Sequence, residues 1–525
     1  MTQPLLQIRN FSVALPKGAD RPFAVHNITL DVKPAEILCV VGESGSGKSV
    51  LTSALMGAAP QGLRVSGGEV FMGDRNLLTL SERQWRSIRG KDIGMIFQEP
   101  MASLNPALTA GQQIEEVFEL HSDLKRAERV EKTRKLVEEM HLPEPDRILR
   151  SYPHQLSGGQ CQRVVIAMAL AMNPKLLIAD EPTTALDVTT QAQVLKLIRE
   201  LRDGHGHGII FITHDLGVVA DIADRIAVMR HGELVEIGAA EQILKTPQHD
   251  YTKSLIAAVP SLKPAERPQM TKDLSPVLSV DALNHSYGNK QVLYDISLSV
   301  APGQVLSIVG ESGSGKSTVA RNLIRLIDPT SGRIAIAGQN ILELDKTSLR
   351  GMRRHIQMIF QDPFGSLNPR RKVGSVIARA AILSGCSRTE AVARAKELLE
   401  LVGLPRSAYN RRPVAFSGGQ RQRIGIARAL AMRPDVLIAD ESVSALDVSV
   451  QAQVLELLAS LQKRFSLAVV FITHDLRVAA QISDEIVVMS KGRIVERGPA
   501  CQVLTQPQHH YTRELIEAAP GRGAF

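Results

Sequence analysis

The sequence predicts an α/β protein made of two homologous domains in tandem. One eight-residue stretch, GESGSGKS, occurs twice without a change, at Gly42–Ser49 and at Gly310–Ser317. In both halves, short apolar runs rich in β-branched residues alternate with stretches of helical periodicity. Such alternation is typical of a mainly parallel sheet that is covered by helices.

The resemblance between the halves extends well beyond the repeated loop. The segments that begin at Ile209 and Val469 also match closely. The spacing between matching residues drifts from 268 at the loop to 260 further along, as differences in loop length would produce. We therefore expect domains at residues 1–260 and 277–525, joined by a proline-rich, polar linker at 261–276.

Composition fits a two-domain globular protein. A chain of 525 residues exceeds what one hydrophobic core supports, and 44% hydrophobic residues is an ordinary content. The four cysteines are too scattered for a disulfide framework or a zinc site. The net charge of +8 is spread along the chain and is interpreted as a solvated surface. The N-terminus does not resemble a signal peptide, and the apolar run Val164–Met172 is half a membrane span, so a cytoplasmic chain is expected.

Individual elements follow from these patterns. Buried strands are predicted at ILCVV before Gly42, at LLIA from Leu176 and at IIFIT from Ile209, with VLSIV, VLIA and VVFIT in the matching places of the second half. Helices are predicted over Arg126–Met140 and Arg388–Val402.

Each repeated loop has the form GxxxxGK[ST] and directly follows a predicted strand, which identifies a phosphate-binding P-loop. Its glycines let backbone N–H groups turn toward a phosphate, and the next helix presents its positive end to the same anion. Lys48 and Lys316 are expected to reach the β- and γ-phosphates. The predicted nucleotide-binding residues are Gly42, Ser44, Gly45, Ser46, Gly47, Lys48, Ser49 and Val50, and Gly310, Ser312, Gly313, Ser314, Gly315, Lys316, Ser317 and Thr318.

Two acidic residues follow one another at a strand end in each half. Asp180 and Asp440 are expected to hold Mg²⁺ through water, and Glu181 and Glu441 to accept a proton from an attacking water. The alternative for each glutamate is a helix-start or surface acid.

Polar side chains also end the neighbouring predicted strands. His214 and His474 follow IIFIT and VVFIT, while Gln98 and Gln361 close MIFQ in each half. Ligands bind at the carboxyl ends of strands in open parallel sheets, so these side chains are candidates for the same site. Taken alone, each would be a turn-capping histidine or an ordinary amide.

A second glycine turn precedes a helical run in each half. We call these the SGGQ segments, Ser157–Gln160 and Ser417–Gln420, and a helix start of this kind favours an anion. The predicted binding residues are Ser157, Gly158, Gly159 and Gln160, and Ser417, Gly418, Gly419 and Gln420.

The order of these motifs, which occurs twice and covers nearly the whole chain, resembles the ATPase subunits of ABC transporters. This resemblance implies two tandem P-loop NTPase domains of the ABC ATPase type, each a mainly parallel sheet with helices plus a helical subdomain. It implies ATP and Mg²⁺ as ligands and ATP hydrolysis as the activity. The implied catalytic residues are Glu181, Glu441, His214, His474, Gln98 and Gln361, and the implied metal-binding residues are Ser49, Ser317, Gln98, Gln361, Asp180 and Asp440.

In that family two ATPase domains meet head to tail, so each ATP lies between the P-loop of one and the SGGQ segment of the other. The resemblance thus implies one site from Gly42–Ser49 with Ser417–Gln420 and another from Gly310–Ser317 with Ser157–Gln160. Asp187 and Asp447 match the family's D-loop, which couples the two sites.

The C-terminal tails narrow the resemblance. PQHDYT at Pro247–Thr252 and PQHHYT at Pro507–Thr512 look like the element that follows the ATPase domain in oligopeptide, dipeptide and nickel importers. This implies two transmembrane permease partners, through them an extracytoplasmic solute-binding protein, and a peripheral place on the cytoplasmic face of the inner membrane. No nucleic acid is expected. The sequence assigns no role to the two elements and does not identify the solute among peptides, modified peptides, glutathione, nickel or opines.

One departure from the family pattern concerns the residue that would stack on adenine in the first half. Tyr287 precedes the second P-loop where the family has an aromatic that stacks on the base. Its counterpart is Leu15, with Phe11 or Phe23 as candidate substitutes.

Two further departures suggest inequivalent but active sites. Ser442 stands where the first half has Pro182, which loosens the predicted turn after Glu441. Cys161 follows the first SGGQ segment where the second half has Arg421, with modest effect if the side chain points to solvent.

Two other classes of ABC ATPase fit the sequence less well. Tandem ATPases that act on ribosomes resemble one another in a long charged helical arm between their domains, whereas the linker here is short and proline-rich. DNA-repair ATPases with similar motifs carry zinc-type cysteine pairs, which this sequence lacks.

Overall fold

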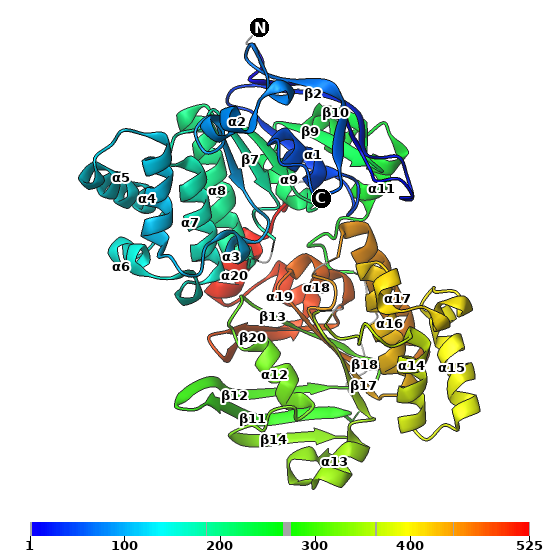
Figure 1. Ribbon diagram of the computed structural model, residues 1–525. Coiled ribbons are helices and arrows are strands. Elements are labelled where there is room, and N and C mark those ends of the chain that lie inside the picture. The colour runs from blue at the N-terminus through cyan, green and yellow to red at the C-terminus, as the bar shows by residue number, and fades with distance from the viewer. Residues whose placement is uncertain (1–2, 185, 266–274, 363–364, 445, 524–525) are drawn as a thin grey trace. The chain divides into compact units, whose positions relative to one another are not determined.

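The computed structural model describes residues 3–184, 186–265, 275–362, 365–444 and 446–523, and the chain divides into two compact units at residue 259 (Figure 1). Of the predicted linker, residues 266–274 lie outside the described residues. Its beginning belongs to the second unit, because the amide of Ala265 donates to the carbonyl of Ala480 and Gln481 donates to the carbonyl of Ser261.

The main sheet of the first unit has six strands, and only its edge strand β10 is antiparallel to its neighbour. Its order is β10 (Glu233–Ala239), β9 (Arg225–Arg230), β3 (Ile37–Val41), β8 (Gly208–Ile212), β7 (Leu176–Asp180) and β6 (Ile93–Ile96). All residues of β3, β7 and β8 are buried, as expected for apolar runs in a sheet covered on both faces. The parallel strands end at one edge, which gathers the P-loop, Gln98, Asp180 and His214.

A second, antiparallel sheet was not predicted. Its order is β2 (Phe23–Val32), β1 (Leu6–Ala14), β4 (Arg64–Met72) and β5 (Arg75–Asn76). Burial alternates irregularly along β1 and β2, because one face packs on the core and the other meets solvent. The prediction of a mainly parallel sheet with helices is therefore confirmed for the six-stranded sheet, with a four-stranded antiparallel sheet added to it.

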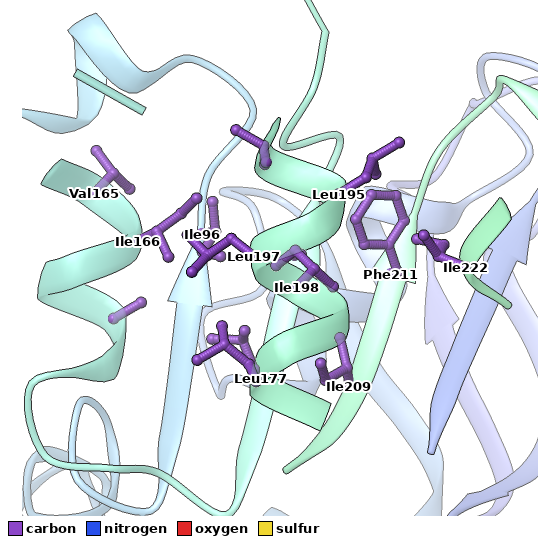
Figure 2. Packing of buried hydrophobic residues seen from close by; sticks show 14 of the residues in the cluster. Ile96, Val165, Ile166, Leu177, Leu195, Leu197, Ile198, Ile209, Phe211 and Ile222 are labelled. Atoms are coloured by element: carbon purple, nitrogen blue, oxygen red, sulfur yellow. The ribbon is translucent and has the colours of Figure 1, made fainter. Parts of the chain in front are cut away.

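Helices cover the six-stranded sheet, and α4–α6 form the predicted helical subdomain beside α7 (Figure 1). The helix α8 packs Leu195 and Ile198 against the strand residues Leu177 and Phe211 (Figure 2). The helices are α1 (Lys48–Leu55), α2 (Glu82–Ile88), α3 (Pro100–Ser103), α4 (Ala110–His121), α5 (Arg126–Glu139), α6 (Pro145–Arg150), α7 (Gly158–Leu170), α8 (Val188–His205), α9 (Leu216–Ile222), α10 (Ala240–Lys245) and α11 (Asp250–Ala257).

The second unit repeats this plan, with α14 and α15 in its helical subdomain. Its antiparallel sheet has the order β12 (Lys290–Val300), β11 (Leu278–Tyr287), β14 (Ser331–Ile336) and β15 (Gln339–Asn340), and its main sheet β16 (Ile356–Ile359), β17 (Val436–Asp440), β18 (Ala468–Thr473), β13 (Val305–Val309), β19 (Glu485–Ser490) and β20 (Arg493–Pro499). The helices are α12 (Lys316–Leu323), α13 (Lys346–Met352), α14 (Val373–Leu383), α15 (Arg388–Leu401), α16 (Gly418–Ala431), α17 (Val448–Phe465), α18 (Leu476–Ile482), α19 (Ala500–Thr505) and α20 (His510–Ala518). Within the described residues, every helix of the chain is too short or too polar to cross a membrane.

Candidate nucleotide-binding and hydrolysis sites

The P-loop of the first unit needs glycine at both ends. Gly42 has φ 151° and Gly47 has φ 101°, in the region that favours glycine. A Cβ on Gly42 would lie 2.2 Å from the carbonyl oxygen of Met229, and one on Gly47 would lie 2.5 Å from that of Ala24. The loop is thus packed against neighbouring backbone that leaves no room for a side chain.

The loop lysine is held by the loop itself. Nζ of Lys48 donates to the carbonyls of Gly42 at 2.7 Å and of Glu43 at 3.0 Å, and Lys316 makes the matching bonds in the second unit. The hydroxyl of Ser46 is buried and has no partner within the described part of the chain, so the loop can still satisfy a further polar group. This cradle fits a phosphate.

A hydroxyl and a carboxylate face each other where the metal ligands are predicted. Oγ of Ser49 lies 3.2 Å from Oδ1 of Asp180, and Oγ of Ser317 lies 3.3 Å from Oδ1 of Asp440. Oxygen pairs of this kind suit Mg²⁺. Burial, and then the charge of Glu441, raise the pKa of Asp440 to about 6, and burial is also the main cause that raises the pKa of Asp180. A divalent cation would favour the charged form of both aspartates, so the residues fit the ion.

A pH dependence follows for the metal-free protein. The pKa of Asp440 rises from 3.8 to about 6 on folding, so its stabilising contribution is complete below about pH 4 and is lost as pH rises through about 6. Because Asp440 is only 5% exposed, the loss amounts to about 3 kcal/mol. In EDTA, the unfolding midpoint should fall between about pH 4 and pH 7 in the parent and less in Asp440→Asn. The exposed Asp281→Asn should behave like the parent, and equal falls in all three would refute the expectation.

Glu181 lies at the centre of a small network. Gln98 Nε2 donates to Oε2 of Glu181 at 3.0 Å, and His214 Nδ1 lies 3.4 Å from Oε1. Burial alone would raise the pKa of Glu181, but hydrogen bonds and charge from His214, followed by Thr184, lower it to about 2. The carboxylate is therefore ionised at neutral pH and can accept a hydrogen bond or a proton from water.

The second unit has a slightly different network. Gln361 Nε2 donates to Oε2 of Glu441 at 2.6 Å, and His474 Nδ1 lies 3.7 Å from Oε1. Burial again opposes the shift, yet His474, Lys316 and Gln361 lower the pKa of Glu441. The hydroxyl of Ser444 donates to the backbone carbonyl of Glu441, whereas Thr184 donates to the carboxylate of Glu181. Sequence reasoning did not single out Thr184, although its place three residues after the glutamate is visible in the repeat.

Both glutamates have a backbone conformation that is uncommon for this residue type. Glu181 has φ 47° and Glu441 has φ 42°. Strain of this kind costs on the order of 1–3 kcal/mol and is typical of functional positions. The following turn is closed by matching hydrogen bonds in both units, with Pro182 in one and a buried Ser442 in the other.

The SGGQ segments begin α7 and α16. In each, the serine hydroxyl accepts from the glutamine amide while the serine amide donates to the glutamine side chain. A Cβ on Gly158 would meet nothing within 4 Å, whereas one on Gly159 would lie 2.4 Å from Thr190. The first glycine therefore leaves the helix start open to a ligand, and the second allows α7 to approach α8. Asp187 caps α8 by accepting from the amide of Thr190.

The structure corrects the interpretation of Cys161. Its side chain is fully buried rather than directed to solvent, and Sγ lies 3.5 Å from the carbonyl oxygen of Pro153. In the second unit, Arg421 contacts the equivalent carbonyl, since its Nε donates to the carbonyl of Pro413 at 2.8 Å. The two residues are thus alternative ways to pack the turn before the SGGQ segment.

The predicted adenine contacts differ between the units. Tyr287 is 47% exposed, so its ring can be stacked upon. Phe11 is fully buried in the core and cannot take this role, which corrects one candidate. Phe23 is partly buried and stacks on His26, and Leu15 is also partly buried.

Comparison with known proteins identifies the family. A family model described as "ABC transporter" matches residues 25–184 and 293–444, which is more than half of the chain. The chain belongs to the ABC transporter family. As a member it binds and hydrolyses ATP. A second model, "Oligopeptide/dipeptide transporter, C-terminal region", matches residues 235–286 and 495–523 of this ABC ATPase.

Similar curated proteins align with almost the whole of this chain and with most of their own length. The peptidoglycan transport ATP-binding protein YejF of Agrobacterium fabrum is 45% identical over 99% of this chain and 97% of its own. The glutathione import ATP-binding protein GsiA of Salmonella typhimurium is 46% identical over 99% of this chain and 90% of its own. Among solved structures, the dimeric ATP-binding cassette MJ0796 bound to ADP and Pi is 30% identical, with a TM-score of 0.41, and covers 45% of this chain and 98% of its own. The family models and the curated relatives confirm the predicted resemblance to ATPases of the oligopeptide, dipeptide and nickel importer group, and they give no support to a ribosomal role.

Proposed function

We propose that this ABC ATPase energises a membrane importer for peptides or related small solutes. The observation that carries the proposal is the match of both C-terminal regions to the oligopeptide and dipeptide transporter model. The names of the relatives, which transport peptidoglycan or import glutathione, support the same class of solute. The chain would act at the cytoplasmic face of the inner membrane, bound to two permease subunits and through them to a solute-binding protein.

The test of this proposal is to identify what purifies with the full chain. A C-terminal tag, membranes solubilised in mild detergent and mass spectrometry should recover two permeases. Their associated binding protein would then define the solute. Recovery of ribosomal proteins without a permease would overturn the proposal.

Within each half, we assign the residues as follows. Ser49 and Asp180 would hold Mg²⁺ together with Gln98, and the ion would supply charge neutralisation at the phosphates. Glu181 would accept a hydrogen bond from the attacking water, and His214 would contact the γ-phosphate. The second half would use Ser317, Asp440, Gln361, Glu441 and His474 in the same roles.

We further propose that two ATP molecules bind between the halves, each held by the P-loop of one half and the SGGQ segment of the other. This pairing predicts that two double variants, which share one substitution, differ in the number of sites that they alter. Lys48→Ala with Ser417→Arg alters a single site, whereas Lys48→Ala with Ser157→Arg alters both.

The measurement is the amount of ATP that stays bound through gel filtration in a background that carries Glu181→Gln and Glu441→Gln. We expect two per chain in this background, one for the first pair and none for the second. Lys316→Ala with Ser157→Arg is the matched control and should retain one. Equal retention by the first two pairs would refute the pairing.

A further inference from the structure

The two C-terminal elements, PQHDYT at Pro247–Thr252 and PQHHYT at Pro507–Thr512, have a defined local structure. In the first unit, Glu236 on β10 accepts from the backbone amides of Gln248 and His249. Nδ1 of His249 then accepts from the amide of Tyr251 and caps α11. Burial would raise the pKa of Glu236, but the side chain of Thr252, followed by the two backbone amides, lowers it, so the carboxylate keeps its charge. The second unit repeats the arrangement with Glu496, Gln508, His509 and Tyr511 at the start of α20.

The tyrosine of each element reaches back to the P-loop. The amide of Glu43 donates to the hydroxyl of Tyr251 at 3.1 Å, and the amide of Glu311 donates to that of Tyr511 at 3.1 Å. The two residues of each contact are far apart in the sequence, by 208 positions in the first unit and by 200 in the second. The same contact in both halves, formed by motifs that differ in only one letter, indicates a shared purpose.

The contact acts on one peptide group. The carbonyl of Gly42 accepts from Lys48 Nζ at 2.7 Å, and the amide of Glu43, which belongs to the same peptide unit, donates to Tyr251. One planar unit is therefore fixed at both of its polar ends. Because Gly42 lacks a Cβ, nothing in its own side chain would stop this peptide from rotating.

The tyrosines are placed to hold this position firmly. Tyr251 is 6% exposed, and the guanidinium of Arg230 lies 4.7 Å from its ring centroid. Tyr511 is partly buried, and this burial raises its pKa to about 12, so its hydroxyl stays protonated at physiological pH. The loop amide thus meets a hydroxyl acceptor on a packed helix in both units.

We propose that Tyr251 and Tyr511 are positioning residues for ATP, which fix the first peptide of each P-loop and with it the carbonyls that hold the loop lysine. The inference rests on the proposed role of Lys48 and Lys316 at the phosphates. It gives the C-terminal elements a purpose in the ATPase cycle: each one ties the end of its half to the loop that receives the nucleotide.

The test is the paired variant Tyr251→Phe with Tyr511→Phe in the full chain. Loss of one hydrogen bond per loop should raise the Kd and the KM for ATP about fivefold, while kcat at saturating ATP stays within about twofold. The thermal unfolding midpoint should stay close to that of the parent, since each ring keeps its packing. Tyr409→Phe, which removes a hydroxyl in the helical subdomain, is the matched control and should leave ATP affinity unchanged.

Two outcomes would overturn the proposal. One is an unchanged KM and Kd in the double phenylalanine variant, and the other is a joint fall in kcat, affinity and unfolding midpoint, which would indicate a merely structural hydroxyl. Lys48→Ala with Lys316→Ala tests the underlying assignment separately. If that variant binds ATP as well as the parent, the proposed role of the lysines fails, whatever the tyrosine variants do.

Discussion

Replacing Glu181 and Glu441 together by glutamine is expected to lower ATP hydrolysis by about 10²- to 10⁴-fold and to leave ATP binding intact. The reason is the state of the two carboxylates: each is largely buried and held in the ionised form by the histidine beside it. Glutamine keeps the shape of the side chain but cannot accept a proton from water. Phosphate release at saturating ATP, with ATP binding by calorimetry, measures both quantities.

The single variants decide whether both halves hydrolyse ATP. We expect Glu181→Gln and Glu441→Gln each to lower the rate, because each removes one of two glutamates that share the positive φ and the same glutamine and histidine neighbours. The exposed Glu69→Gln on β4 is the control and should hydrolyse ATP normally. If one of the two variants lost all activity while the other kept it intact, only one half would be catalytic.

Much of this architecture could be predicted from local sequence. The strands β3, β7 and β8 are continuous apolar runs that directly precede charged or glycine-rich segments, so both their burial and their direction toward the site could be inferred. The sequence also predicts that the polar side chains at these strand ends lie close together, since strand ends of one parallel sheet meet at one edge. Gln98 and His214 both lie within contact distance of Glu181 because all three follow neighbouring strands of this sheet.

Other features depend on contacts that no local pattern encodes. The antiparallel sheet escaped prediction because β1 and β2 alternate irregularly, with register shifts along their pairing. The burial of Cys161 depends on the turn that contains Pro153, and the contact of Tyr251 with the P-loop depends on tertiary folding across the whole domain. The positive φ of Glu181 is a strain that surrounding structure imposes against the preference of the residue.

The second large effect is expected from Gly42→Ala. Its new Cβ would lie 2.2 Å from the carbonyl oxygen of Met229, which is backbone on the adjoining strand β9 and cannot swing away. We expect overpacking to cost about 1–3 kcal/mol, and the unfolding midpoint of the first unit to fall by roughly 2–12 °C. ATP affinity should fall as well, because the displaced peptide is the one that holds Lys48.

Two further variants test this expectation, one at the equivalent glycine of the second unit and one at a glycine with free space around it. Gly310→Ala should reproduce it in the second unit, where the Cβ would lie 2.2 Å from the carbonyl oxygen of Met489. Gly158→Ala adds the same methyl group where nothing lies within 4 Å, so its unfolding midpoint should stay near that of the parent. If Gly42→Ala and Gly158→Ala unfolded at the same temperature, the P-loop would not be pressed against β9, and the tyrosine contact would have a mobile loop to hold instead of a fixed one.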